Sequence, residues 1–121
     1  MATEAGTVSV AQVALAATTL TDIYTCKRRS TVLLTCVHVC NRGAATTFRL
    51  AIAYAGAADD VSQYLFYDTI LPANSSFPAE WVRGWALGYG DVVRAYAGSA
   101  NVSVNAGAEI TPDEDGDGVA A

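Results

Sequence analysis

The stretch TVLLTCVHVCN at residues 31–41, followed after the turn RGAA by TTFRLAIAY at residues 46–54, indicates the fold class. β-Branched, aromatic and large aliphatic residues dominate both segments and suit a pleated, buried surface. In the second segment Phe48, Leu50 and Ile52 alternate with smaller or polar residues, which predicts a strand with one face in a core. The first segment is apolar almost throughout, which predicts a central strand.

The same rhythm of short strands and small-residue turns extends outward in both directions. Further strands are expected at Thr7–Val13, Thr19–Cys26, Ser62–Leu71, Ser76–Leu87, Val92–Tyr96 and Asn101–Ile110. Pro78 and Gly84 interrupt Ser76–Leu87, so this segment reads as two short strands around a bend. The last two segments are expected to pair with each other. About eight short strands predict an all-β chain that forms a single antiparallel β-sandwich or jelly-roll-like domain.

A length of 121 residues fits one domain with extended arms at both ends. Residues 1–18 form an N-terminal arm or first strand, residues 19–110 the β-sandwich domain, and residues 111–121 an acidic C-terminal tail. The arm and the tail are the segments expected to contact other subunits.

The chain carries few charges for its size. Its composition is 52% hydrophobic and 16% charged, against about 25% charged in a typical soluble domain. Four of the twelve acidic residues lie in the tail, which leaves eight acids against seven bases and a nearly neutral body. Excess apolar surface predicts self-association. A nucleic-acid partner is not expected, because the only basic run is Lys27–Arg29.

The N-terminal sequence and the cysteines are consistent with synthesis and folding in a cytoplasm. The stretch Val8–Leu20 is too polar for a membrane span, and Glu4 stands where a signal peptide would be positive. Cys36 and Cys40 are four apart on one strand, about 13 Å, which is too far for a disulfide. Together with Cys26 they are an odd set of three, which predicts reduced thiols acting as small apolar side chains.

Two groups of residues invite a metal interpretation. Cys36, His38 and Cys40 share one strand face, but zinc sites use closely spaced ligand pairs, so an ordinary strand face is the preferred interpretation. Asp113, Asp115 and Asp117 with their intervening glycine resemble the first half of a calcium loop. The glutamate that completes such a loop would fall beyond Ala121. A flexible acidic tail is therefore preferred; calcium bound there with help from another subunit remains the alternative, and no other cofactor is expected.

Nothing in the sequence predicts an enzyme. The single histidine is mid-strand, and no Gly-x-Ser-x-Gly motif is present. Asp68, Glu80 and Asp91 could supply paired carboxylates, but acids at strand ends and turns usually serve solubility and turn geometry. The aromatic residues are better interpreted as core or contact anchors than as a sugar-binding face. The expected anchors are Tyr64, Tyr67, Trp81 and Trp85.

Several segments together resemble a widespread type of small tailed-bacteriophage structural protein. They are Thr19–Thr25, Val39–Leu50, Gln63–Asp68, Leu71–Asn74, Gly90–Ala97, Asn101–Ser103 and Gly107–Ile110. The likeness covers about residues 18–110 and consists of strand and turn signatures rather than a catalytic motif. The tail after Ile110 departs from the pattern.

The resemblance implies a virion component with no enzymatic residues to carry over. It favours a capsid decoration (cement) protein, which would bind the major capsid protein lattice at local symmetry axes, commonly as a trimer. A tail, neck, baseplate or fibre-attachment protein is the alternative. A carbohydrate-binding module that helps a virion adhere to its host is a third hypothesis, from a different functional class.

Overall fold

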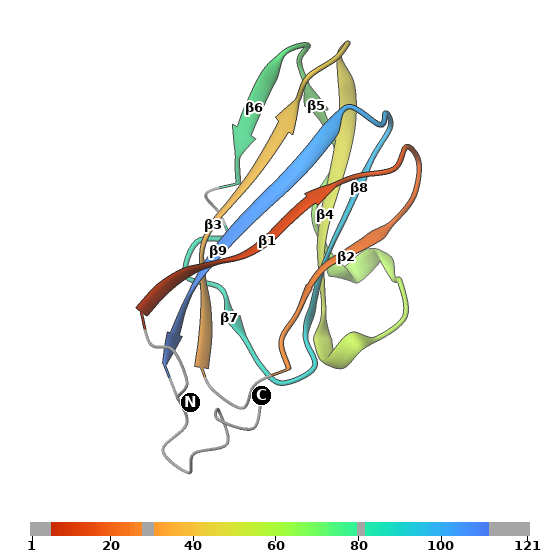
Figure 1. Cartoon of the computed structure of the whole chain (residues 1–121). Coiled ribbons are helices and arrows are strands. Elements are labelled where there is room, and N and C mark those ends of the chain that lie inside the picture. Colours follow the sequence, from red (N-terminus) through yellow and green to blue (C-terminus); the bar gives the residue numbers. More distant parts are fainter. Residues whose placement is uncertain (1–5, 28–30, 80–81, 112–121) are drawn as a thin grey trace.

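The computed structural model describes residues 6–27, 31–79 and 82–111, which form an all-β sandwich of two antiparallel sheets (Figure 1). Its nine strands are β1 (Gly6–Ala14), β2 (Thr21–Thr25), β3 (Thr31–Asn41), β4 (Thr46–Ala53), β5 (Tyr64–Leu71), β6 (Ser75–Pro78), β7 (Ala86–Leu87), β8 (Val92–Ala97) and β9 (Val102–Thr111). Two 3-10 turns, η1 (Tyr54–Gly56) and η2 (Val61–Gln63), join β4 to β5. No helix within these residues is long and apolar enough to cross a membrane.

The strands divide into two layers. Sheet A has the order β1-β9-β3-β6, with β7 also paired to β3, and sheet B has the order β2-β8-β4-β5. The predicted all-β sandwich is confirmed. The segment at residues 76–87 does form two short strands, which accounts for nine strands rather than about eight.

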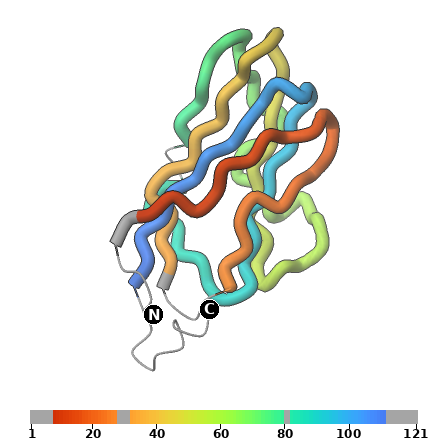
Figure 2. The backbone as a smooth tube through the Cα atoms, viewed as in Figure 1, coloured from red at the N-terminus to blue at the C-terminus, as the bar shows by residue number. Residues whose placement is uncertain are grey.

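Most connections carry the chain from one sheet to the other, as the path of the tube shows (Figure 2). Only β4 and β5 are consecutive strands that also pair with each other. The expected pairing of the last two strands is wrong, because β8 lies between β2 and β4 whereas β9 lies between β1 and β3. A Cβ at Gly98 would come within 2.7 Å of Thr46 Oγ1. This glycine therefore allows the turn after β8 to pass close to β4 on its way to sheet A.

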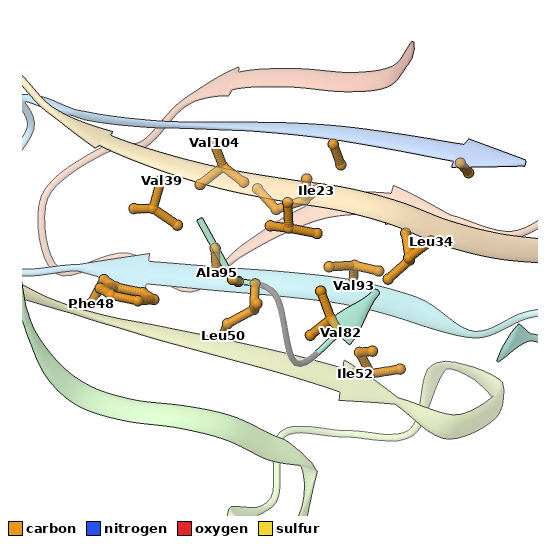
Figure 3. Close-up of a cluster of buried hydrophobic side chains, with 14 of the residues drawn as sticks. Ile23, Leu34, Val39, Phe48, Leu50, Ile52, Val82, Val93, Ala95 and Val104 are labelled. Carbon is orange, nitrogen blue, oxygen red and sulfur yellow. The ribbon is translucent and has the colours of Figure 1, made fainter. Parts of the chain in front are cut away.

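The core lies between the sheets and contains side chains from both (Figure 3). Phe48, Leu50 and Ile52 are buried, as their alternation predicts. Burying each such side chain stabilises the fold by about 1.5–3 kcal/mol. Tyr54 does not continue the pattern and is 81% exposed, because β4 ends at Ala53 and the chain turns into η1.

The central strand β3 is apolar almost throughout because the set of positions that faces the core changes partway along the strand. A bulge between Leu34 and Cys36 shifts its pairing with β9 by one residue. Leu34 is buried before the bulge, and Val37 and Val39 are buried after it. The continuous apolar run therefore reflects a switch from even to odd core positions rather than two buried faces. Cys36 and His38 point outward and are exposed.

Asn41 organises the turns at one end of the sandwich. Its side chain is 1% exposed. Nδ2 donates to the carbonyls of Ala44, Leu71 and Pro72 at 2.9–3.3 Å, and Oδ1 accepts from the Gly43 amide at 2.9 Å. One buried amide thus joins the β3–β4 turn to the end of β5, and its hydrogen bonds offset the cost of burying it.

Candidate interaction surfaces

Two rows of residues on the outer face of sheet A, which cross four neighbouring strands, contain no Asp, Glu, Lys or Arg. The register places Gln12, Asn105, His38 and Pro78 in one row across the sheet, and Ala14, Ser103, Cys40 and Ser76 in the next. Together with Ser9, Gly107 and Cys36, these two rows are named here the uncharged face. Glu109 is the first acid met beyond it along β9.

Two bulges shape this surface around Gly107. Gly107 pairs with Ser9 on one side and with Cys36 on the other, and both ladders shift register there. A Cβ at Gly107 would lie 3.2 Å from Cys36 Sγ and 3.2 Å from Thr35 Oγ1. Two depressions of about 210 and 290 Å³ adjoin Cys36 and His38; Gly107 lines the larger, and Arg83, outside the two rows, lines the smaller. The glycine therefore leaves a hollow that a partner side chain can enter.

The cysteines and the histidine are not arranged as a metal site. Cys36 and His38 are exposed and Cys40 is half-buried on the same outer face, so the predicted shared face is found. Among the described residues no group of three or more His, Cys, Asp and Glu side chains is placed to hold a metal ion. Cys26 is buried, and none of the three cysteines is in a disulfide. Cys26 fits the prediction of a small apolar thiol, whereas exposed Cys36 does not.

The outer face of sheet B is built around Arg49. The Arg49 guanidinium lies 4.1 Å from the ring centroid of Tyr67 and 4.5 Å from that of Tyr96. Its Nε donates to Asp68 Oδ1 at 2.6 Å, and its Nη2 donates to Asp68 Oδ2 at 3.3 Å. Tyr64 packs edge-on against Tyr67, with ring centroids 5.1 Å apart. We call Arg49, Tyr64, Tyr67, Asp68 and Tyr96 the arginine–tyrosine cluster.

A bulge in β5 produces this arrangement. Phe48 faces Thr69 and Leu50 faces Phe66, so two residues of β5 oppose Arg49. Asp68 adopts a left-handed backbone conformation (φ 50°) within this bulge, a region that aspartate tolerates better than most residues. Strict alternation along the expected strand Ser62–Leu71 would place Tyr64, Phe66, Asp68 and Ile70 on one face, and the structure does not show this arrangement. The bulge breaks the alternation, and Ile70 is 72% exposed.

The ion pair between Arg49 and Asp68 shifts both groups in the expected directions. The hydrogen bond from Arg49 lowers the pKa of Asp68 below its usual 3.8. The hydrogen bond to Asp68 raises the pKa of Arg49. Burial, followed by a hydrogen bond from its hydroxyl to Asp59 (2.9 Å), raises the pKa of Tyr64. The cluster is therefore internally satisfied, with its charges paired.

Arg94 ties the long β4–β5 loop to sheet B. Its Nε donates to Asp22 Oδ1 at 2.9 Å, and its Nη1 donates to the Ala57 carbonyl at 2.8 Å. Asp60 caps η2 by accepting from the Ser62 amide at 3.0 Å. Hydrogen bonds from the Ser62 hydroxyl and amide lower the pKa of Asp60. These contacts hold the β4–β5 loop, which contains Asp59 and Asp60, in one conformation.

Asp91 joins two loops at the end of the sandwich opposite Asn41. Its carboxylate accepts from the Ala55 amide at 2.8 Å and from the Gly88 amide at 2.9 Å. It is only 7% exposed, so of the two roles expected for such an acid it serves turn geometry and not solubility. The sequence offers a signal for this role, because Gly88 and Gly90 just before Asp91 mark a turn whose amides need an acceptor. The loops that Asp91 joins present Tyr54 and Tyr89, which are 81% and 66% exposed.

The predicted anchors do not form one site. Tyr64 and Tyr67 are together on sheet B, whereas the Trp85 carbonyl accepts from the Leu34 amide beside sheet A, with Trp85 40% exposed. Trp81, Glu80 and the tail residues Asp113, Asp115 and Asp117 lie outside the described residues. Sequence analysis missed Arg49 and Tyr96. The alternation in β4 puts Arg49 on the outer side, but its neighbours depend on strand pairing.

Comparisons with known proteins give no relative for this chain: no family model, curated protein or solved structure matches it.

Proposed function

We propose that this chain is a non-enzymatic structural protein of a tailed-bacteriophage virion, most directly a capsid decoration (cement) protein that binds the major capsid protein lattice and stabilises the head. The observation that supports a docking role is the uncharged face of sheet A. The virion setting rests on the sequence resemblance over residues 18–110.

The uncharged face suits burial against another protein. Charged side chains resist transfer out of water unless they are paired, and this face contains none. The cores of protein interfaces are likewise depleted of charged residues. A stable contact buries about 800 Å² on each partner. The hollows beside Cys36 and His38 provide depressions that partner side chains could enter.

Binding to purified heads that lack the protein tests this role. We expect saturable binding in hundreds of copies per particle, together with heads that resist heat better than bare heads. A few to a few dozen copies located at the tail, neck or baseplate would support the alternative assignment. Absence of the protein from virions, with no binding to heads or tails, would contradict both.

A carbohydrate-binding role has less support. Sugar sites use open aromatic faces, whereas Arg49 lies over the rings of Tyr67 and Tyr96, and Tyr64 packs against Tyr67. A glycan array with purified protein distinguishes the two functional classes. We expect no binding; saturable binding that Tyr67→Ala abolishes would favour adhesion instead.

A further inference from the structure

Strand β1 is a free edge of sheet A. It lies at the end of the order β1-β9-β3-β6, and the described residues give it no strand partner except β9. Between Gly6 and Ala14 it contains no charged residue and no proline. An edge strand of this kind presents backbone groups that another strand can pair with.

The other three edges are each protected. Strand β6 has four residues and ends in Pro78, which has no amide hydrogen to donate. Strand β5 has two register shifts and the left-handed Asp68. Strand β2 has five residues and a register shift between Asp22 and Tyr24. Bulges, prolines and short strands are the usual ways in which proteins block edge pairing. Strand β7, which also pairs with β3 at that edge, has only two residues. Strand β1 has a register shift of its own between Ser9 and Ala11, but among the described edge strands longer than two residues it alone has neither a proline nor a charge.

The backbone groups that β1 can offer are those of Gln12 and Ala14. The Leu15 amide donates to the Val102 carbonyl at 2.9 Å, in register with the pairs Ala14–Ser103 and Val13–Val104. Successive residues of an antiparallel ladder face alternately toward and away from their partner. The amides of Gln12 and Ala14 therefore face away from β9, toward the open side.

We infer that β1 pairs antiparallel with β1 of a second copy of this chain, joining two copies of sheet A into one continuous sheet. The contact is self-complementary, because a two-fold axis brings each strand against itself and no like charges meet. The uncharged faces of the two copies then adjoin on one side of the joined sheet. A partner with the same net charge of −5 approaches with least repulsion at such a segment. This inference rests on the strand edge and does not depend on the virion role.

Proline at position 12 tests the contact. Gln12→Pro removes an amide that faces the open side while leaving the β1–β9 ladder in place, so the variant should remain folded and become monomeric. The matched control Gln12→Thr keeps the amide and should self-associate like the parent chain. Sedimentation velocity at high micromolar concentration measures the oligomeric state, and circular dichroism shows whether each variant is folded.

Hydrogen exchange of the parent chain provides a second readout that needs no variant. The amides of Gln12 and Ala14 should exchange at least about tenfold more slowly in the associated state than at high dilution. A parent chain that stays monomeric at high micromolar concentration would overturn the inference. So would a dimer that persists in folded Gln12→Pro, or Gln12 and Ala14 amides whose exchange is independent of concentration. A parent chain that is monomeric yet binds heads would leave the proposed function intact, because docking uses the side chains of the uncharged face, most of them on β9, β3 and β6, whereas self-pairing uses the backbone of Gln12 and Ala14.

Discussion

On the outer face of sheet B, Arg49 and Arg94 each contact a carboxylate, and the tyrosine rings pack on the Arg49 guanidinium or on one another. On the outer face of sheet A, two hollows adjoin Cys36 and His38, and the two central rows contain no charged residue; Arg83 lines the smaller hollow from outside these rows. The same sandwich thus has one face whose interactions are complete within the chain and one that leaves room for another molecule. On the docking proposal, the exposed aromatic residues of sheet B are therefore expected to matter less than the uncharged rows of sheet A.

The largest predicted difference between the two faces comes from adding one negative charge to each. Ser103→Glu places a carboxylate in the middle of the uncharged face, where docking would bury it without a partner. We expect its affinity for heads to fall at least about 100-fold, equivalent to about 3 kcal/mol. Titration of heads with fluorescent protein measures the change.

Two matched variants control for size and for total charge. Ser103→Gln has nearly the same volume without the charge and should lose much less affinity. Ile70→Glu adds the same charge to the 72% exposed side chain on sheet B and should bind like the parent chain. Equal losses for Ser103→Glu and Ile70→Glu would mean that the two faces do not differ in docking.

The next largest effect is expected from filling the hollow beside Gly107, and it concerns the stability of the fold. Gly107→Val forces a side chain against Cys36, Thr35 and the Val8 carbonyl, so we expect the free energy of unfolding to fall by about 2 kcal/mol. Gly88→Ala is the control, because a Cβ there meets only Asp91 Oδ2 at 3.7 Å. Urea denaturation measures both variants. Unchanged stability in Gly107→Val would show that the backbone at the two bulges can shift to accommodate the larger side chain without a measurable cost.

The smallest effect concerns the paired charges of sheet B. Because Arg49 lowers the pKa of Asp68, the pair contributes stability above about pH 4, where an unpaired aspartate is already ionised, and this contribution is lost as the pH falls through the lower pKa of the folded state. Arg49→Ala should lower the Tm by a few degrees at pH 7, and the difference from the parent chain should shrink under acid conditions.

Arg42→Ala is the control for this pH dependence, since Arg42 is exposed at the opposite turn. Its Tm should follow the parent chain at every pH. A deficit in Arg49→Ala that stayed constant down to strongly acid pH would indicate that ring packing, rather than the ion pair, accounts for its effect.

The sequence was sufficient to predict the strands but not their partners. Alternation located β4 and the long run of β3, because the period of two is a local property of the chain. The crossing from β8 to β9 depends on Gly98 meeting Thr46, a contact between distant residues. The left-handed Asp68 in β5 likewise reversed the expected faces.

The candidate surfaces were predictable to a similar degree. Low overall charge led to the expectation of excess apolar surface, whereas the uncharged face consists largely of uncharged polar residues, and its location required the register of four strands. The anchors Tyr64 and Tyr67 were recognised as aromatic residues of one strand. The position of Arg49 over the Tyr67 ring depends on a bulge in β5 that the sequence pattern does not predict.

The most direct test of the docking proposal is thiol labelling of free and particle-bound protein. Cys36 is exposed on the uncharged face, and buried Cys26 is an internal control that should stay unlabelled throughout. We predict that Cys36 reacts quickly with a maleimide in free protein and becomes protected on the head. Equal labelling of Cys36 in free and head-bound protein would contradict the proposal that this face docks.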